Sequence, residues 1–167
     1  MTRILGLDPG LVRTGWGVVE TRGAELSFVA AGVVRVPESG ALAERLLALH
    51  RGLIEVLQAY RPAEAAVEET VVNCNPATSL RLGHARGVVL LAVAAAGLPV
   101  HEYAARHVKR ALTGTGGAFK EQVAMMVRTL LPGCRTVAPD ATDALAVAIT
   151  HAHHRETARR IAAGTAR

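Results

Sequence analysis

The sequence predicts an α/β fold in which a mixed five-stranded sheet is flanked by helices. Three observations predict it: three apolar stretches joined by short turns at the N-terminus, two later apolar stretches separated by a long helical repeat, and a helical C-terminal region. Consecutive strands with tight turns form an antiparallel meander, and strands that alternate with helices add parallel pairs. The chain of 167 residues, half of them hydrophobic, is long enough for one globular domain.

The first half of the chain supplies the sheet. Strands are predicted at residues 3–8, 15–21 and 26–36, and leucines at helical spacing then predict a helix over 41–60 that ends before Pro62. A buried strand is expected at 64–72, a long helix at 76–96, and a fifth strand at 98–104.

The second half is predicted to be helical, with helices at 104–112, 118–131 and 140–154. Residues 155–167 contain basic and small side chains with little apolar period, which predicts a flexible basic tail after a single domain of residues 1–154. His151, His153 and His154 close the last predicted helix, where cations complement the helix dipole. Metal binding by these histidines is the less favoured alternative.

Charge and composition indicate the partner and the compartment. The net charge is +5 with an isoelectric point near 10.0, which favours a polyanion such as nucleic acid over an arginine-rich composition without such a partner. The longest apolar stretch, residues 87–100, is broken by Gly97 and Pro99, so no membrane span is expected. Two isolated cysteines and the absence of an export pattern favour the cytoplasm.

The acidic residues indicate a site. The chain has only three aspartates: Asp8 ends the first strand, while Asp140 and Asp143 open the last helix on one face. Glu68 and Glu69 lie near the carboxyl end of the fourth strand. Because sites in α/β sheets gather at the carboxyl ends of parallel strands, these acids are expected to converge. Taken separately, Asp8 could serve its own turn, and the helix pair could cap or complement the helix N-terminus.

Converging carboxylates repel one another, and their pKa values rise unless a cation is present. Oxygen ligands without His or Cys partners at ligand spacing select Mg²⁺ or Mn²⁺ over zinc. Two such ions ~4 Å apart can activate a water and stabilise the leaving oxygen of a phosphodiester. The pattern therefore indicates a metal-dependent nuclease with Asp8 as a ligand held rigidly by the sheet.

Four stretches resemble the RuvC Holliday-junction resolvases: "ILGLDPGLVRTGWGVVE", "AVEE" followed by "NPATSLRLGHARGVVLLAV", "LPVHEYAARHVKRALTGTGGAFKEQVAMMVRTLL", and "DATDALAVAITHAH". They run in order over residues 3–154. The resemblance implies a ribonuclease-H-like fold, a homodimer, and Mg²⁺-dependent paired nicks across four-way junction DNA in recombination and repair. It also implies two ions per site, replaceable by Mn²⁺, and a partnership with the RuvA–RuvB branch-migration machinery.

The resemblance also assigns residues. It places the catalytic metal ligands at Asp8, Glu68, Asp140 and Asp143, and basic contacts to DNA at Lys109 and Lys120. Strand side chains alternate, so only one of the neighbours Glu68 and Glu69 can meet Asp8. Matching "AVEE" to the family's strand motif picks Glu68, and the spacing from the following "NPATSLRLG" agrees with that register.

The two lysines stand out in a chain whose other basic residues are all arginine. A compact ammonium suits a position beside a developing charge, so Lys120 is expected to act in catalysis. Arg81 and Arg86 on the long helix either face DNA or are simply solvated.

Two further features concern the long helix and the loop before it. Just after the glutamate of the fourth strand, relatives often carry an aromatic residue able to stack on bases. This chain has Thr70, Val71 and Val72 there, which argues against base stacking from this loop. Small residues leave a smooth stripe on the helix, which indicates either close packing on the sheet or a dimer contact; they are Gly83, Ala85, Gly87 and Ala92.

Three other functions compete with junction resolution: a nuclease of similar fold acting on RNA, an actin-like or sugar-kinase-like ATPase, and a DNA-binding protein without catalysis. The stretch "LDPGLVRTGWGV" resembles the phosphate-binding hairpin of the ATPases. Those enzymes need two comparable domains and a second acidic-glycine turn, and this sequence contains no Asp-Gly pair. If the protein bound DNA without catalysis, the confinement of its three aspartates to site-like positions would be a coincidence.

Overall fold

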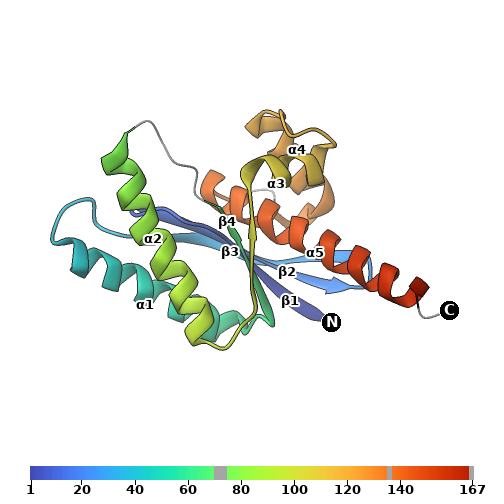
Figure 1. The fold of residues 1–167 in the computed structure, drawn as a ribbon, viewed down its shortest axis with the longest axis horizontal. Helices are drawn as coiled ribbons and strands as arrows, with labels where there is room; N and C mark the ends of the chain where they lie inside the picture. The colour runs from blue at the N-terminus through green and yellow to red at the C-terminus, as the bar shows by residue number, and fades with distance from the viewer. Residues whose placement is uncertain (70–74, 135–136, 166–167) are drawn as a thin grey trace.

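The structure is a computed structural model that describes residues 1–69, 75–134 and 137–165. After an initial run of strands, helices and strands alternate as far as β5, and the chain then ends in consecutive helices (Figure 1). They are β1 (Thr2–Asp8), β2 (Arg13–Arg22), β3 (Glu25–Arg35), α1 (Leu42–Tyr60), β4 (Glu64–Glu68), α2 (Pro76–Ala95), β5 (Val100–Tyr103), α3 (Ala105–Thr113), α4 (Lys120–Leu130), a short 3₁₀ turn (Pro132–Cys134) and α5 (Pro139–Thr165).

The five strands form one mixed sheet in the order β3-β2-β1-β4-β5. The first three strands pair antiparallel, which confirms the predicted meander. β4 pairs parallel to β1 on one side and parallel to β5 on the other. β1 is therefore central, and its carboxyl end lies beside the carboxyl end of β4.

Helices cover both faces of the sheet. The strand residues Leu5, Leu7 and Val67 pack into a core with α1 and α2, whereas the alternate residues Ile4 and Ala66 pack into a second core with α3, α4 and α5. This separation follows from the two-residue period of a strand. Figure 1 shows α5 lying along the sheet on the face opposite α1 and α2.

Glycines in β1 and β2 allow α5 to lie close to the sheet. A Cβ atom added at Gly6 would come within 2.0 Å of the Ala144 carbonyl oxygen, and one at Gly15 would come within 2.0 Å of the Asp140 carbonyl oxygen. Both contacts are with helix backbone, so no side-chain movement could relieve them. The glycines thus fix how closely the start of α5 approaches the end of β1.

The last helix is longer than predicted. The sequence analysis ended it at residue 154, but α5 continues to Thr165, so the predicted flexible tail is helical over its described part. Extending an existing helix carries no nucleation cost, and Glu156 forms ion pairs with Arg159 and Arg160 one turn later. No helix in the described part of the chain is both long and apolar enough to cross a membrane.

Candidate active site

Two carboxylates reach the site from neighbouring parallel strands. The register pairs Leu7 with Val67, so Asp8 and Glu68 follow side by side at the carboxyl ends of β1 and β4. Alternation along each strand turns both side chains toward the face covered by α5. The turn after Asp8 is held by the buried Thr14, whose hydroxyl donates to the Gly10 carbonyl oxygen at 2.7 Å.

The third carboxylate comes from α5. The helix begins at Pro139, which makes Asp140 its second residue rather than its N-cap, and Asp143 lies one turn further on. Asp143 lines a cavity of about 260 Å³ together with Asp8 and Glu68. Asp140 is half-buried beside this cavity, and its charge contributes to the raised pKa of Asp8.

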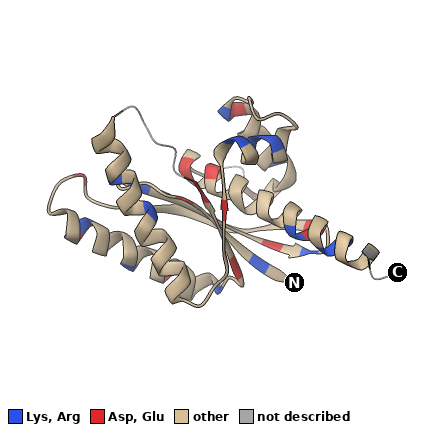
Figure 2. Ribbon diagram, in the orientation of Figure 1, with Lys and Arg blue, Asp and Glu red and all other residues tan. Residues whose placement is uncertain are grey.

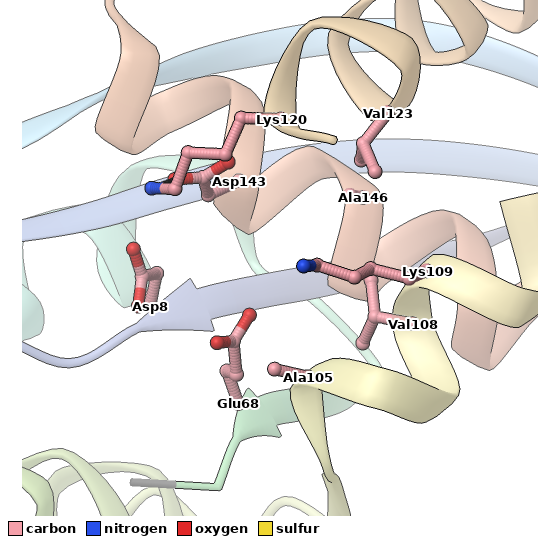
Figure 3. A pocket seen from close by; sticks show the side chains of 9 residues that line it. All are labelled: Asp8, Glu68, Ala105, Val108, Lys109, Lys120, Val123, Asp143 and Ala146. Carbon is pink, nitrogen blue, oxygen red and sulfur yellow. Dashed lines mark hydrogen bonds and ion pairs between the residues drawn. The ribbon is translucent and has the colours of Figure 1, made fainter. Parts of the chain in front are cut away.

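Two lysines complete the cavity. The Lys120 ammonium donates to the Asp143 carboxylate at 3.0 Å, and Lys109 points into the same space from α3 (Figure 3). The remaining walls are apolar and belong to α3, α4 and α5: Ala105, Val108, Val123 and Ala146. Figure 2 shows the acidic start of α5 facing the basic residues of α3.

Burial and mutual repulsion make the strand carboxylates weak acids. Burial, followed by the charge of Asp143, raises the pKa of Asp8 from its ordinary 3.8 to about 6, and the nearby Lys120 only partly opposes this. Burial and the charges of Asp8 and Asp143 raise the pKa of Glu68 from 4.5 to about 7. The hydrogen bond from Lys120 to Asp143 in turn raises the pKa of this lysine.

This arrangement fits a divalent metal ion. At least three carboxylates share one small cavity, and the lysines do not compensate their repulsion, as the raised pKa values of Asp8 and Glu68 show. A cation with hard oxygen preference would relieve the repulsion directly. The atoms in the cavity that could ligate a metal ion are carboxylate oxygens, which favours Mg²⁺ or Mn²⁺ over zinc.

Other residues singled out from the sequence lie apart from the cavity. Glu69 is exposed beyond the end of β4, and its backbone N–H donates to the Tyr103 carbonyl oxygen at 2.9 Å. Arg86 pairs with Glu102 of β5, while Arg81 is exposed on α2. The residues Thr70, Val71 and Val72, which stand where relatives often carry an aromatic residue, lie outside the described residues.

The predicted smooth stripe on α2 divides into two faces. Ala85 and Ala92 are buried against the sheet, whereas Gly83 and Gly87 have no atoms within 4 Å of an added Cβ. The glycines therefore point away from the rest of the chain.

The sequence analysis missed the glycines that bring α5 to the site. Gly6 and Gly15, with Gly17, lie inside apolar strand segments, and a glycine in a strand interior often marks a place where another backbone approaches closely. That signal was present in "ILGLD" and "TGWGVV" and could have predicted the helix contact.

The chain is similar to known proteins over nearly its whole length. The family model described as crossover junction endodeoxyribonuclease RuvC matches residues 4–151. The chain belongs to the RuvC family. A RuvC of Paramagnetospirillum magneticum is 60% identical over 165 residues, covering 99% of both chains. Another, from Azorhizobium caulinodans, is 59% identical over 155 residues, covering 93% of this chain and 92% of the relative.

Solved RuvC structures share the fold. The Thermus thermophilus RuvC in complex with Holliday junction substrate is 36% identical with a TM-score of 0.88, covering 95% of this chain and 97% of that chain. A second structure of Thermus thermophilus RuvC is 38% identical with a TM-score of 0.83, covering 93% of this chain and 96% of that chain. The ribonuclease-H-like fold is thereby confirmed. Nucleases of the RuvC family use divalent metal ions, in agreement with the carboxylate cavity.

Proposed function

We propose that this chain resolves four-way DNA junctions in recombination and repair by paired symmetric nicks, using two Mg²⁺ ions per active site. The observation that carries the proposal is the carboxylate cavity at the ends of β1 and β4, in a chain of the RuvC family. The Thermus thermophilus relative, which shares the fold over nearly the whole chain, was solved with a Holliday junction substrate.

The four acids have complementary roles in this proposal. Asp8 and Glu68 form the rigid side of the metal site because the central strands hold them, and Asp143 faces them from α5. Asp140, half-buried beside the cavity, completes the set. When bound, the ions supply an activated water on one side of the scissile phosphodiester and stabilise the leaving oxygen on the other; Mn²⁺ can replace Mg²⁺.

The lysines contribute positive charge at the same place. Lys120 has an 80% exposed side chain, so its ammonium can leave Asp143 and reach a DNA phosphate bound over the cavity. Lys109 approaches from α3 and would contact the same strand of DNA. Arg81 and Arg86 would extend DNA contacts along α2, although Arg86 must first release Glu102.

Two symmetric nicks require two active sites related by a two-fold axis, so we propose a homodimer. The outer face of α2 supports it, since Leu80, Gly83, Gly87 and Leu91 form an exposed apolar stripe at helical spacing. Leu80 and Leu91 are 65% and 62% exposed. By family membership, the dimer would act in the bacterial cytoplasm with the RuvA–RuvB branch-migration machinery, and residues 1–154 would form the single nuclease domain.

The decisive experiment compares a synthetic four-way DNA junction with a linear duplex of the same arm sequence and with an RNA–DNA hybrid. We expect paired nicks near the exchange point of the junction, only with Mg²⁺ or Mn²⁺. Equal cleavage of the linear duplex would contradict junction selectivity, and preferred cleavage of the hybrid would favour the RNA nuclease. Binding should weaken steeply with added salt because DNA contacts release counterions.

The dimer has its own test. Sedimentation of the wild-type protein at micromolar concentration should show a dimer, and Leu91→Glu should shift it toward the monomer. Leu47→Glu is the matched control, since Leu47 is 48% exposed and lies on α1 rather than on α2. A fully active monomer would overturn the dimer proposal while leaving the nuclease assignment intact.

A further inference from the structure

A second group of ligand-type side chains lies at the far end of β4 from the carboxylate cavity. Glu64, His101 and His151 each offer one ligand atom, and these three atoms lie within 4.8 Å of one another. Glu64 is four residues before Glu68, which corresponds to about 13 Å along the strand. His151 is eight residues after Asp143, about 12 Å along α5. The group is therefore separate from the active site.

The fold brings the three residues together from three elements. Ala66 pairs with His101 in the register of β4 and β5, so His101 faces the same side of the sheet as Glu64 and Glu68. α5 crosses this side and presents His151, whose ring stacks on that of His101 with centroids 4.2 Å apart. The edge strand β5, the start of β4 and the middle of α5 thus meet at one point.

We propose that Glu64, His101 and His151 bind a zinc-type transition-metal ion, distinct from the catalytic ions, with water completing the coordination. Two imidazoles and one carboxylate are a donor set that suits Zn²⁺ and its neighbours, whereas the all-oxygen cavity suits Mg²⁺. The His101 imidazole has no side-chain hydrogen-bond partner among the described residues and offers one ligand atom, so one imidazole of the group is available as a ligand.

The surrounding contacts orient the ligands as metal sites require. The Tyr103 hydroxyl lies 2.8 Å from Nδ1 of His151, so its oxygen can accept a hydrogen bond from Nδ1–H and leave Nε2 as the ligand atom. Arg155 donates to Oε1 of Glu64 at 2.8 Å and leaves Oε2 facing His151.

The distances require only a small adjustment. A tetrahedral zinc ion with bonds of about 2.0–2.1 Å holds its ligand atoms roughly 3.3 Å apart. Oε2 of Glu64 and Nε2 of His151 are 2.8 Å apart and would separate slightly. His101 is exposed and can turn its ring toward the pair. The bound ion would join β4, β5 and α5 and stabilise the protein by mass action.

The competing explanation is a hydrogen-bonded network without metal. In that state the Tyr103 hydroxyl donates to Nδ1 of His151, and Nε2–H donates to Glu64. A second histidine pair lies nearby, since Nε2 of His107 and Nε2 of His154 are 2.6 Å apart. An experiment must therefore separate the proposed site from the network, from this second pair, and from the carboxylate cavity.

The test uses the full-length protein freed of metal, with millimolar Mg²⁺ present to occupy the carboxylate cavity. Micromolar Zn²⁺ should raise the melting temperature, and Co²⁺ should develop the visible absorption of a nitrogen-ligated ion. His101→Ala removes an exposed ligand and should weaken Zn²⁺ binding by at least about tenfold, and Tyr103→Phe should weaken it about 10–100-fold. His107→Ala is the matched control, an exposed histidine whose loss should leave Zn²⁺ affinity unchanged.

Each other outcome would overturn the proposal. No Zn²⁺ effect on the wild-type protein would leave the group as a hydrogen-bonded network. A loss of binding in His107→Ala but not in His101→Ala would place the ion at the second histidine pair. Retained binding in both variants would place it elsewhere. Junction cleavage, measured separately in Mg²⁺, tests the proposed function independently.

Discussion

Glu64 and Glu68 lie on the same strand and face the same helix, yet their environments have opposite effects. Burial and the charges of Asp8 and Asp143 raise the pKa of Glu68 to about 7. Burial also acts to raise the pKa of Glu64, but hydrogen bonds from His151 and Arg155 outweigh it and lower this pKa. Glu68 lies among like charges, whereas Glu64 lies between partners that donate hydrogen bonds to it.

The difference separates carboxylates that repel one another from a carboxylate whose charge is already paired. The cavity around Glu68 keeps its carboxylates close together because the sheet and α5 hold them there, and an ion or protons must relieve their repulsion. The Glu64 carboxylate, by contrast, already has hydrogen-bond partners in His151 and Arg155. Changes at the two ends of β4 should therefore have different consequences for cleavage and for stability.

The largest expected effect is the loss of cleavage on removing an aspartate. Asp8→Asn, Asp140→Asn and Asp143→Asn each remove a ligand charge with almost no change in volume, and each should lower the cleavage rate at least about a hundredfold. Junction binding, measured by gel shift, should be largely unchanged. Cleavage at the wild-type rate in all three variants would mean that the aspartates serve the turn and the helix N-terminus.

The neighbouring residues Glu68 and Glu69 at the end of β4 give the sharpest test of the metal site. Glu68→Gln should lose Mg²⁺-dependent junction cleavage to a similar degree, because its carboxylate lines the cavity. Glu69→Gln is the adjacent control and should retain most of the activity, since Glu69 is exposed outside the cavity. The reverse pattern, measured on the same junction, would show that the metal site uses the other glutamate.

A smaller loss is expected at Lys120. Lys120→Ala should reduce the cleavage rate about 10–100-fold and binding much less, since the ammonium acts beside the reacting phosphate. Single-turnover rates and binding constants distinguish the two effects. Lys120→Arg tests the geometry: full activity would show that any positive charge suffices, whereas we expect the planar guanidinium to substitute poorly.

Stability without metal should depend on pH through the cavity. The folded protein holds protons on Asp8 and Glu68 up to about pH 6 and about pH 7, whereas the unfolded chain releases them near 3.8 and 4.5. The folded state therefore binds more protons between about pH 4 and pH 7, and the free energy of unfolding falls as pH rises through this window.

Urea unfolding in a chelator should show this fall, and Mg²⁺ should reverse it at pH 8. Glu68→Gln supplies the control, because it should be more stable than the wild type at pH 8 without metal. Equal stabilities of the two proteins across this pH range would contradict the raised pKa of Glu68.

The smallest effect concerns the other end of the strand. Glu64→Gln should leave Mg²⁺-dependent cleavage almost unchanged and should lower the free energy of unfolding by about 1–3 kcal/mol, because it removes the carboxylate charge that pairs with Arg155. Urea unfolding at neutral pH measures this. A loss of cleavage comparable with that of Glu68→Gln would show that the two ends of β4 are coupled.

Local patterns were sufficient to predict most of the fold. Turn residues and apolar periods predicted the meander, the alternation of strands and helices, and a sheet of mixed direction, whereas the strand order that places β4 beside β1 comes from the structure. The main error was at the C-terminus, where helix was predicted to end at residue 154. Periodicity detects a buried face, but residues 155–164 continue α5 with their side chains mostly exposed. The ion pairs of Glu156 with arginines one turn away support this extension.

The sequence alone also indicated which acids matter, because three aspartates stand at a strand end and a helix start in a chain that otherwise uses glutamate. Only the tertiary structure decided how they meet. Gly6 and Gly15 let the backbone of α5 approach the sheet, strand alternation turned Glu68 inward, and the same helix carried His151 to Glu64. Chemistry-bearing residue types are local properties of a sequence, whereas distances between them depend on packing between segments that are far apart in the chain.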